Sequence, residues 1–150
     1  NSSNLGARNA GRTFGKFAFF VTVIGDGGKG IVVVLLGRYL DVSEFSLTVG
    51  ILFVVLGHLY PFWLKFKGGK GIATGIGALL VFSPILLLAL IAGFIVSLPF
   101  TKSLTISMVV GFFTYSIYIL VTGKFELLLL IVMLMLLTFK HRENLRERVK

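Results

Sequence analysis

The stretch Pro-Ile-Leu-Leu-Leu-Ala-Leu-Ile-Ala-Gly-Phe-Ile-Val-Ser-Leu-Pro-Phe occupies residues 84–100 and carries no charged side chain. A helix needs about 20 mainly apolar residues to cross the hydrocarbon core of a bilayer, because each residue adds about 1.5 Å. This stretch comes close to that length and therefore predicts a transmembrane helix.

Apolar runs of similar character flank it on both sides. Four more predicted spans are residues 14–40, 46–64, 104–121 and 125–139. A sixth run, 72–82, is short and contains Gly75, Gly77 and Ala78, so we predict a half-length or tightly packed helix there. The chain is thus predicted to be an all-α, polytopic integral membrane helix bundle with about six transmembrane helices, in a single domain spanning residues 1–150.

The composition agrees with a membrane protein. The 150 residues are 56% hydrophobic and 14% charged, whereas soluble domains carry about 25% charged residues. The net charge of +9 would suit nucleic acid if the basic residues formed one patch on a soluble fold. They fall instead mostly between apolar runs, so we expect membrane lipid and anionic ligands, and no nucleic acid, as partners. The absence of Cys and of a His/Asp/Glu cluster with ligand spacing predicts no metal site.

Three of the breaks between runs are rich in Gly, Asn, His or basic residues: 1–13, 65–71 and 140–150. Two predicted runs separate the first break from the second, and four separate the second from the third. Both numbers are even, so all three breaks are predicted to emerge on one face, and the excess of Lys and Arg places that face in the cytoplasm. This assignment requires the short run 72–82 to be a real span rather than a re-entrant segment.

The middle break continues into the sequence Phe-Lys-Gly-Gly-Lys-Gly-Ile-Ala-Thr, residues 66–74. Glycines around Lys70 free the backbone to bring several N–H groups toward one phosphate, and the next helix adds its positive N-terminal end. The spacing differs from a P-loop, which disfavours a nucleotide triphosphatase. The alternative is a flexible turn at the membrane surface.

The two terminal breaks carry other anion-binding residue types. The first mixes hydroxyl and amide side chains with two Arg and can wrap an anion, or it is a solvated loop whose charges set the topology. In the last, His141 and Asn144 share a face if the helix continues, and His suits proton transfer near neutral pH. The alternative there is a basic membrane anchor.

Two ionisable residues, Asp26 and Lys29, fall inside the first run. Such groups at bilayer depth usually face the protein interior and pair, and these two are spaced to pair with each other. The four glycines among residues 25–30 would allow a ligand to approach the backbone. We interpret His58 as a hydrogen-bonding residue between helices rather than a catalyst.

Together and in order, the three segments resemble the bacterial acyl-phosphate-dependent glycerol-3-phosphate acyltransferase family. That family carries G-S-x-N-x-G-A-T-N followed by an Arg, then G-H-x-x-P-x-F-x-x-F-K-G-G-K-G-x-A-T, and finally H-R-x-N-x-x-R. The corresponding residues here are 1–12, 57–74 and 141–146. The resemblance implies a seven-helix bundle, whose first helix would precede this chain.

The sequence departs from the family pattern at four positions. Asn1 and Arg8 stand where the first motif has Gly and Thr, and Trp63 replaces a Phe of the second. In the last motif the second Arg falls at Arg146, one residue early. The Gly-Lys part of the middle motif, which is the most specific, is intact.

The resemblance implies transfer of a fatty acyl group from acyl-phosphate to the 1-hydroxyl of glycerol-3-phosphate. The products would be lysophosphatidic acid and phosphate, in the first step of phospholipid synthesis. It also implies a multi-pass protein of the bacterial cytoplasmic (inner) membrane, with its active site facing the cytoplasm. A possible partner is an enzyme that supplies acyl-phosphate. Acyl-phosphate is already an activated mixed anhydride, so positioning and charge stabilisation suffice and no cofactor is expected.

Carried over residue by residue, the family's motifs give a set of candidate site residues. The candidate catalytic residues are Ser2, Arg12, Lys70, His141 and Asn144. The candidate substrate-binding residues are Asn4, Gly6, Asn9, Lys67, Gly68, Gly69, Gly71, Thr74, Arg142 and Arg146. We expect the Gly-Lys segment to hold the donor phosphate, and the three Arg to compete for the phosphate of glycerol-3-phosphate. Ser2 and Asn144 would orient the acceptor hydroxyl or the carbonyl, while His141 or a substrate phosphate oxygen takes the proton.

The main alternative is a small-anion or metabolite transporter, in which Asp26 and Lys29 line a path. It predicts internal repeats. The string Gly-Gly-Lys-Gly occurs at 27–30 and again at 68–71, but its flanking residues differ. A third alternative, a non-catalytic scaffold subunit, leaves the three anion-type segments unexplained.

Overall fold

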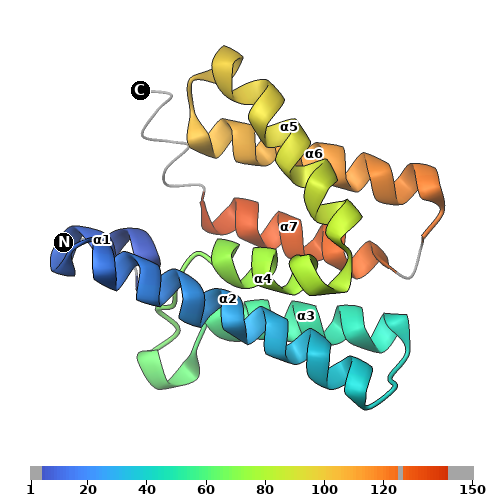
Figure 1. Ribbon diagram of the computed structural model, residues 1–150, viewed down its shortest axis with the longest axis horizontal. Coiled ribbons are helices and arrows are strands. Elements are labelled where there is room, and N and C mark those ends of the chain that lie inside the picture. The colour runs from blue at the N-terminus through green and yellow to red at the C-terminus, as the bar shows by residue number, and fades with distance from the viewer. Residues whose placement is uncertain (1–4, 125–126, 142–150) are drawn as a thin grey trace. The chain divides into compact units, whose positions relative to one another are not determined.

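The computed structural model describes residues 5–124 and 127–141, which form helices joined by short turns (Figure 1). The helices are α1 (Ala7–Phe14), α2 (Lys16–Tyr39), α3 (Glu44–Leu59), the 3-10 helix η1 (Phe62–Leu64), α4 (Ile72–Phe82), α5 (Pro84–Thr101), α6 (Leu104–Thr122) and α7 (Leu128–Lys140). No strand occurs within these ranges. The all-α prediction is confirmed, and the short run 72–82 is a helix with the predicted bounds.

Two predicted boundaries were wrong for identifiable reasons. The run 46–64 is not one helix, because α3 ends at Leu59 and η1 follows Pro61. Proline has no backbone N–H and disfavours helical geometry in the residue before it, and Tyr60 accordingly leaves the helix with φ −134° and ψ 57°. The predicted polar loop 1–13 contains a helix, α1, which Gly15 separates from α2 through a positive φ of 87°.

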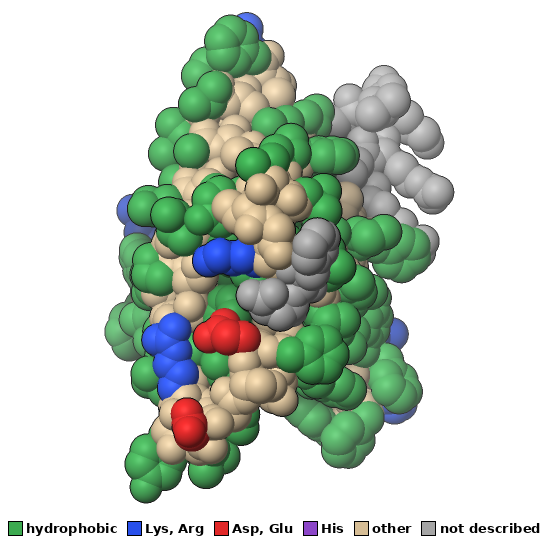
Figure 2. All heavy atoms as spheres, turned by 90° about the vertical axis from the view of Figure 1, so that its right-hand side faces the viewer, with side chains coloured by type: hydrophobic (Ala, Val, Ile, Leu, Met, Phe, Trp, Pro, Cys, Tyr) green, Lys and Arg blue, Asp and Glu red, His purple; other side chains and the backbone are tan. Residues whose placement is uncertain are grey.

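The surface of the described residues is dominated by apolar side chains. Phe17, Phe100 and Val121 are about four-fifths exposed, and Figure 2 shows hydrophobic side chains over most of the face that it displays. Four segments are long and apolar enough to cross a membrane: Lys16–Tyr39, Glu44–Leu64, Pro84–Thr101 and Leu104–Thr122. The helices α4 and α7 are apolar but shorter. The number of crossings in the whole chain stays a prediction, as does the assignment of the polar breaks to the cytoplasm.

Packing divides the chain into two compact units, Asn1–Phe82 and Ser83–Lys150. In the first unit α2 is central, with α1, α3 and α4 packed against it. In the second unit α6 packs against both α5 and α7. The single domain over residues 1–150 therefore stays a prediction.

Glycines bring α2 and α4 into backbone contact. A Cβ atom added to Gly77 of α4 would lie 2.1 Å from the carbonyl oxygen of Gly27 in α2. A Cβ added to Gly30 of α2 would lie 2.2 Å from the carbonyl oxygen of Thr74 and 2.6 Å from the nitrogen of Ala78. The predicted close approach through small residues is confirmed. Of the four glycines at 25–30 that would allow a ligand to approach the backbone, Gly27 and Gly30 contact α4 instead.

The direction of α4 follows from its contacts along α2. The start of α4 lies beside the middle of α2, where Ala73 is near Gly27. At its other end, Arg38 of α2 donates a hydrogen bond of 2.9 Å from Nη2 to the carbonyl oxygen of Phe82, the last residue of α4. The two helices therefore run in the same direction and finish together. Within this unit α4 continues toward the end of α2 rather than turning back.

We predict that Gly77→Ala destabilises the protein by about 1–3 kcal/mol, because the new methyl group forces two backbones apart. The matched control is Gly25→Ala on the face of α2 where a Cβ meets nothing within 4 Å. That control should be neutral or stabilising by up to about 1 kcal/mol, since Ala is the better helix former. Thermal unfolding of both variants in detergent measures the difference. Equal midpoints for the two would contradict the close contact.

Candidate functional site

The loop between η1 and α4 contains half of the predicted substrate-binding residues that lie in the first unit, together with the candidate catalytic residue Lys70. It includes Lys67, Gly68, Gly69, Lys70 and Gly71, and it leads directly into the first turn of α4. The loop turns sharply, with positive φ at Lys65 (52°), Phe66 (61°) and Gly71 (78°). It is a defined turn rather than an extended linker.

The backbone N–H groups of Gly68 and Gly69 point into the protein. They donate hydrogen bonds of 3.2 Å to the carbonyl oxygens of Leu59 and His58, respectively, at the end of α3. Both glycines are buried, and a Cβ on either would collide with His58. In this structure these two N–H groups therefore fix the loop to α3 rather than facing a ligand, and the part of Gly68 and Gly69 in phosphate binding stays a prediction.

The groups that remain available to an anion lie one step further along the chain. Among the described residues, the N–H groups of Ile72 and Ala73 in the first turn of α4 have no hydrogen-bond partner. The hydroxyl of Thr74, which is fully buried, also has none in the part of the chain that the structure covers. Unpaired donors at a helix N-terminus bind anions well, because the helix dipole adds positive potential there.

Lysines add positive charge next to this helix start. Lys70 is half-buried within the loop, and Lys67 is exposed two residues before Gly69. These positive charges and the N–H groups of Ile72 and Ala73 all lie within residues 67–73, and they are the kinds of groups that complement a phosphate. That this segment holds a phosphate stays a prediction.

The predicted residues of α1 lie on a helix rather than in a wrapping loop. Gly6 is the N-cap of α1, Asn9 is half-buried in it, and Arg12 is exposed in its last turn. Within the described ranges the side chain of Arg12 makes no hydrogen bond or ion pair. The structure does not join Arg12 to the loop that contains Lys70, and its role stays a prediction.

His141 ends α7 in the second unit. Its side chain is buried, and Nδ1 lies 2.8 Å from the carbonyl oxygen of Leu137. A carbonyl oxygen can only accept, so Nδ1 carries the hydrogen and Nε2 of the neutral ring has the lone pair. The remaining candidates, Ser2, Asn4, Arg142, Asn144 and Arg146, lie outside the described residues, and their placement stays a prediction.

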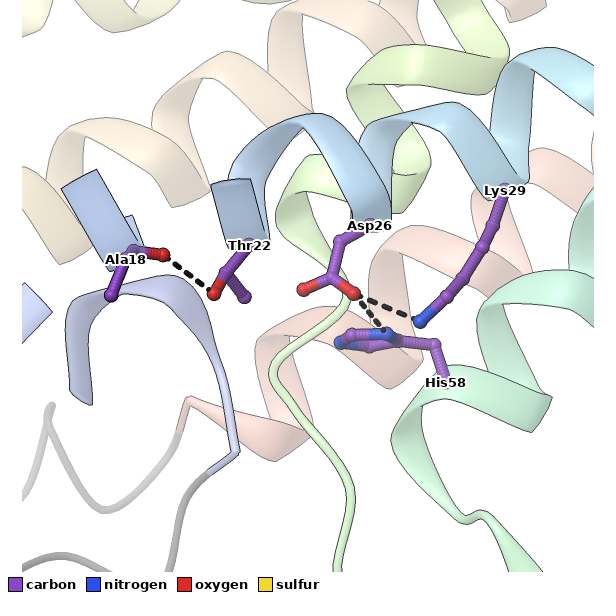
Figure 3. Close-up of polar contacts among 5 residues, drawn as sticks. All are labelled: Ala18, Thr22, Asp26, Lys29 and His58. Atoms are coloured by element: carbon purple, nitrogen blue, oxygen red, sulfur yellow. Dashed lines mark hydrogen bonds and ion pairs between the residues drawn. The ribbon is translucent and has the colours of Figure 1, made fainter. Parts of the chain in front are cut away.

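One connection was missed by reasoning from the sequence. The predicted pair of Asp26 and Lys29 is confirmed at 2.9 Å, but the same carboxylate oxygen also lies 3.5 Å from Nδ1 of His58 (Figure 3). The interpretation of His58 as a residue that links helices is confirmed, since it joins α3 to α2. No periodicity in the sequence relates residues 26 and 58, because only the packing of α3 on α2 brings them together.

The fold defines a class: a helical integral membrane protein, with backbone donors that have no partner among the described residues at the start of α4. The sequence profile of the family described as glycerol-3-phosphate acyltransferase matches residues 1–150. A relative named glycerol-3-phosphate acyltransferase from Coxiella burnetii (strain CbuG_Q212) is 36% identical over 147 residues, covering 97% of this chain and 76% of the relative. The chain belongs to the glycerol-3-phosphate acyltransferase family, so the resemblance seen in the motifs is confirmed.

Solved structures agree with this assignment. The fold is similar to PlsY (YgiH), described as an integral membrane glycerol 3-phosphate acyltransferase, in its glycerol 3-phosphate form. The TM-score is 0.84 at 28% identity, with 99% of this chain and 76% of that chain covered. The lysophosphatidic acid form of the same protein gives a TM-score of 0.82 at 28% identity, over 97% and 76% of the two chains. The predicted integral membrane protein is thereby confirmed.

We predict that Thr74→Val separates stability from ligand binding. Because the buried hydroxyl has no partner among the described residues, replacing it by a methyl group should leave the free energy of unfolding within about 1 kcal/mol of wild type, or raise it. Affinity for inorganic phosphate, measured by calorimetry, should fall about tenfold, the loss of one good hydrogen bond.

The matched control is Thr48→Val, whose hydroxyl is equally buried but donates to the carbonyl oxygen of Phe45 at 2.7 Å. It should lose stability and keep phosphate affinity. Unchanged phosphate affinity in Thr74→Val would remove Thr74 from the site.

Proposed function

We propose that this membrane acyltransferase transfers a fatty acyl group from acyl-phosphate to the 1-hydroxyl of glycerol-3-phosphate, releasing lysophosphatidic acid and phosphate. The observation that carries the proposal is the first turn of α4, where the N–H groups of Ile72 and Ala73 and the hydroxyl of Thr74 have no hydrogen-bond partner in the part of the chain that the structure describes. Membership of the family supports glycerol-3-phosphate as the acceptor, and the printed names of the two PlsY structures support it as a ligand of that relative.

In the proposed reaction the acceptor hydroxyl oxygen attacks the carbonyl carbon of the acyl-phosphate. A new ester C–O bond forms, the bond between that carbon and the phosphate oxygen breaks, and phosphate leaves with the electron pair. The negative charge that collects on the departing phosphate is stabilised by the start of α4 and by Lys70. Arg12, Arg142 and Arg146 are the proposed ligands of the acceptor's phosphate, with Asn4, Gly6, Asn9 and Lys67 as further binding residues.

The hydroxyl proton has two proposed destinations. Nε2 of His141 is suited to accept it, since the bond from Nδ1 to Leu137 fixes the tautomer and orients the ring. A phosphate oxygen of the donor is the other acceptor. Ser2 and Asn144 are the proposed residues that orient the hydroxyl or the carbonyl.

We further propose that the protein lies in the bacterial cytoplasmic membrane with the site facing the cytoplasm. Glycerol-3-phosphate carries a dianionic phosphate that does not cross lipid, so an enzyme that uses it must open to an aqueous compartment containing it. The basic residues in the predicted inner breaks support that orientation. Acyl-phosphate would come from a separate enzyme that makes this activated anhydride.

The donor is tested with purified protein in detergent, glycerol-3-phosphate, and either acyl-phosphate or acyl-CoA. We expect phosphate release with acyl-phosphate only when both substrates are present, and no free thiol release with acyl-CoA. Turnover of acyl-CoA alone would replace the proposed donor. Uptake of glycerol-3-phosphate into proteoliposomes without acyl transfer would favour a transporter.

We predict that Lys70→Ala lowers kcat/KM by about 10²–10³-fold, the usual cost of removing one charge-stabilising group. The control is Lys65→Gln, an exposed lysine of the same loop, which should keep activity within about twofold. Equal losses in the two variants would indicate a general effect of loop charge.

His141→Gln distinguishes the two proton acceptors. If His141 is the base, kcat should fall by about 10²–10⁴-fold. If the phosphate takes the proton, the loss stays below about tenfold, because His141 would then only orient groups nearby. Rates are measured by phosphate release over a range of glycerol-3-phosphate concentrations.

A further inference from the structure

Asp26 is a buried carboxylate held by two partners. Its side chain is 12% exposed, and the single oxygen Oδ1 lies 2.9 Å from Nζ of Lys29 and 3.5 Å from Nδ1 of His58. Figure 3 shows both side chains pointing at the carboxylate, Lys29 from the same helix and His58 from α3. Burying a carboxylate is costly unless it is paired, so this arrangement fixes the end of α3 against α2.

The opposite edge of the His58 ring touches the glycine loop. A Cβ on Gly69 would lie 2.1 Å from Nε2 and 2.8 Å from Cε1 of His58. The main chain of His58 is also bonded to the loop, since its carbonyl oxygen accepts the N–H of Gly69 at 3.2 Å. The imidazole thus fills the space between the Asp26 carboxylate and the backbone of Gly69.

We propose that Asp26 and His58 are positioning residues for the phosphate site. Asp26 holds the imidazole, and the imidazole holds the loop from Gly68 to Gly71, so that the first turn of α4 and Lys70 meet the phosphate. Lys29 offsets the charge of Asp26, which would otherwise repel the anion. The inference rests on the proposed function only in taking this loop as the phosphate site.

The experiment compares Asp26→Asn, His58→Ala and their double variant with Thr22→Val. Thr22 lies one turn before Asp26 on α2, and its hydroxyl donates to the carbonyl oxygen of Ala18 in the same helix at 2.8 Å, so it is a matched control with no part in the contacts between Asp26, His58 and the loop. Two quantities are measured: the KM for acyl-phosphate, whose phosphate this loop is proposed to hold, and the affinity for inorganic phosphate. Phosphate binding is followed by fluorescence of Trp63, the single tryptophan of the chain, in η1 before the loop.

We expect each single variant to weaken phosphate binding and raise KM about tenfold, with kcat changed less than about threefold. The double variant should be no worse than the worse single one, because both changes break the same link. Thr22→Val should behave as wild type. Losses that multiply in the double variant, or unchanged phosphate affinity with only a lower unfolding temperature, would overturn the proposal.

A second pair of variants tests the contact between His58 and the loop by changing the loop residue. It provides a test even if Asp26→Asn does not fold. In Gly69→Ala the new methyl group collides with Nε2 of His58, whereas in Gly69→Ala/His58→Ala the collision is removed. We expect the double variant to match His58→Ala and to exceed Gly69→Ala in phosphate affinity. A double variant as weak as Gly69→Ala alone would overturn the link through the imidazole. Since the probe is inorganic phosphate, the outcome stays informative if acyl transfer is not observed.

Discussion

The backbone contact between α2 and α4 is the constraint on which the first unit depends. A helix of 11 residues is about 16 Å long, roughly half the hydrocarbon core of a bilayer. It finishes level with the end of α2, because Arg38 reaches the carbonyl oxygen of Phe82. Its start must therefore lie beside the middle of α2. Gly27, Gly30 and Gly77 permit the close contact there, because they place no side chain between the two helices.

A helix that begins at such a depth exposes polar backbone where lipid cannot satisfy it. Irregular backbone at membrane depth is tolerated only when protein buries it or when it lines a polar site. Both conditions are met here. Gly68 and Gly69 donate to the end of α3, while the N–H groups of Ile72 and Ala73 have no protein partner among the described residues. The start of the short helix thus keeps backbone donors for a ligand, which is the physical basis of the phosphate site that we propose.

The buried cluster of Asp26, Lys29 and His58 helps to hold the loop that precedes α4. The end of α3 is held to α2 by Asp26 and His58, and the loop is held to the end of α3 by two hydrogen bonds and by contact with the imidazole. The contacts from α2 to the loop are made by charged and polar groups. Leaving such a group without a partner in a low-dielectric interior is costly. These contacts therefore give the loop one position rather than several.

Much of this was predictable from the sequence because its causes are local. Hydropathy along the chain identified the apolar helices but not α1, since the length of an apolar run depends only on neighbouring residues. The Gly-Lys segment predicted a phosphate site before α4. The boundary after Leu59 was missed although Pro61 signals it, because hydrophobicity continues through Phe62, Trp63 and Leu64. The inward orientation of the Gly68 and Gly69 N–H groups could not be predicted, since both donate to residues that only the fold brings near.

The sequence by itself determined that this chain is an all-α membrane protein of the acyltransferase family, with an anion-type segment before a short helix. Tertiary structure decided which donors of that segment are used internally and which remain for a ligand, and it joined Asp26 to His58. The physical reason is that hydropathy and glycine content are properties of single segments. Hydrogen-bond partners and ion pairs between α2, α3 and the loop exist only once those segments are packed.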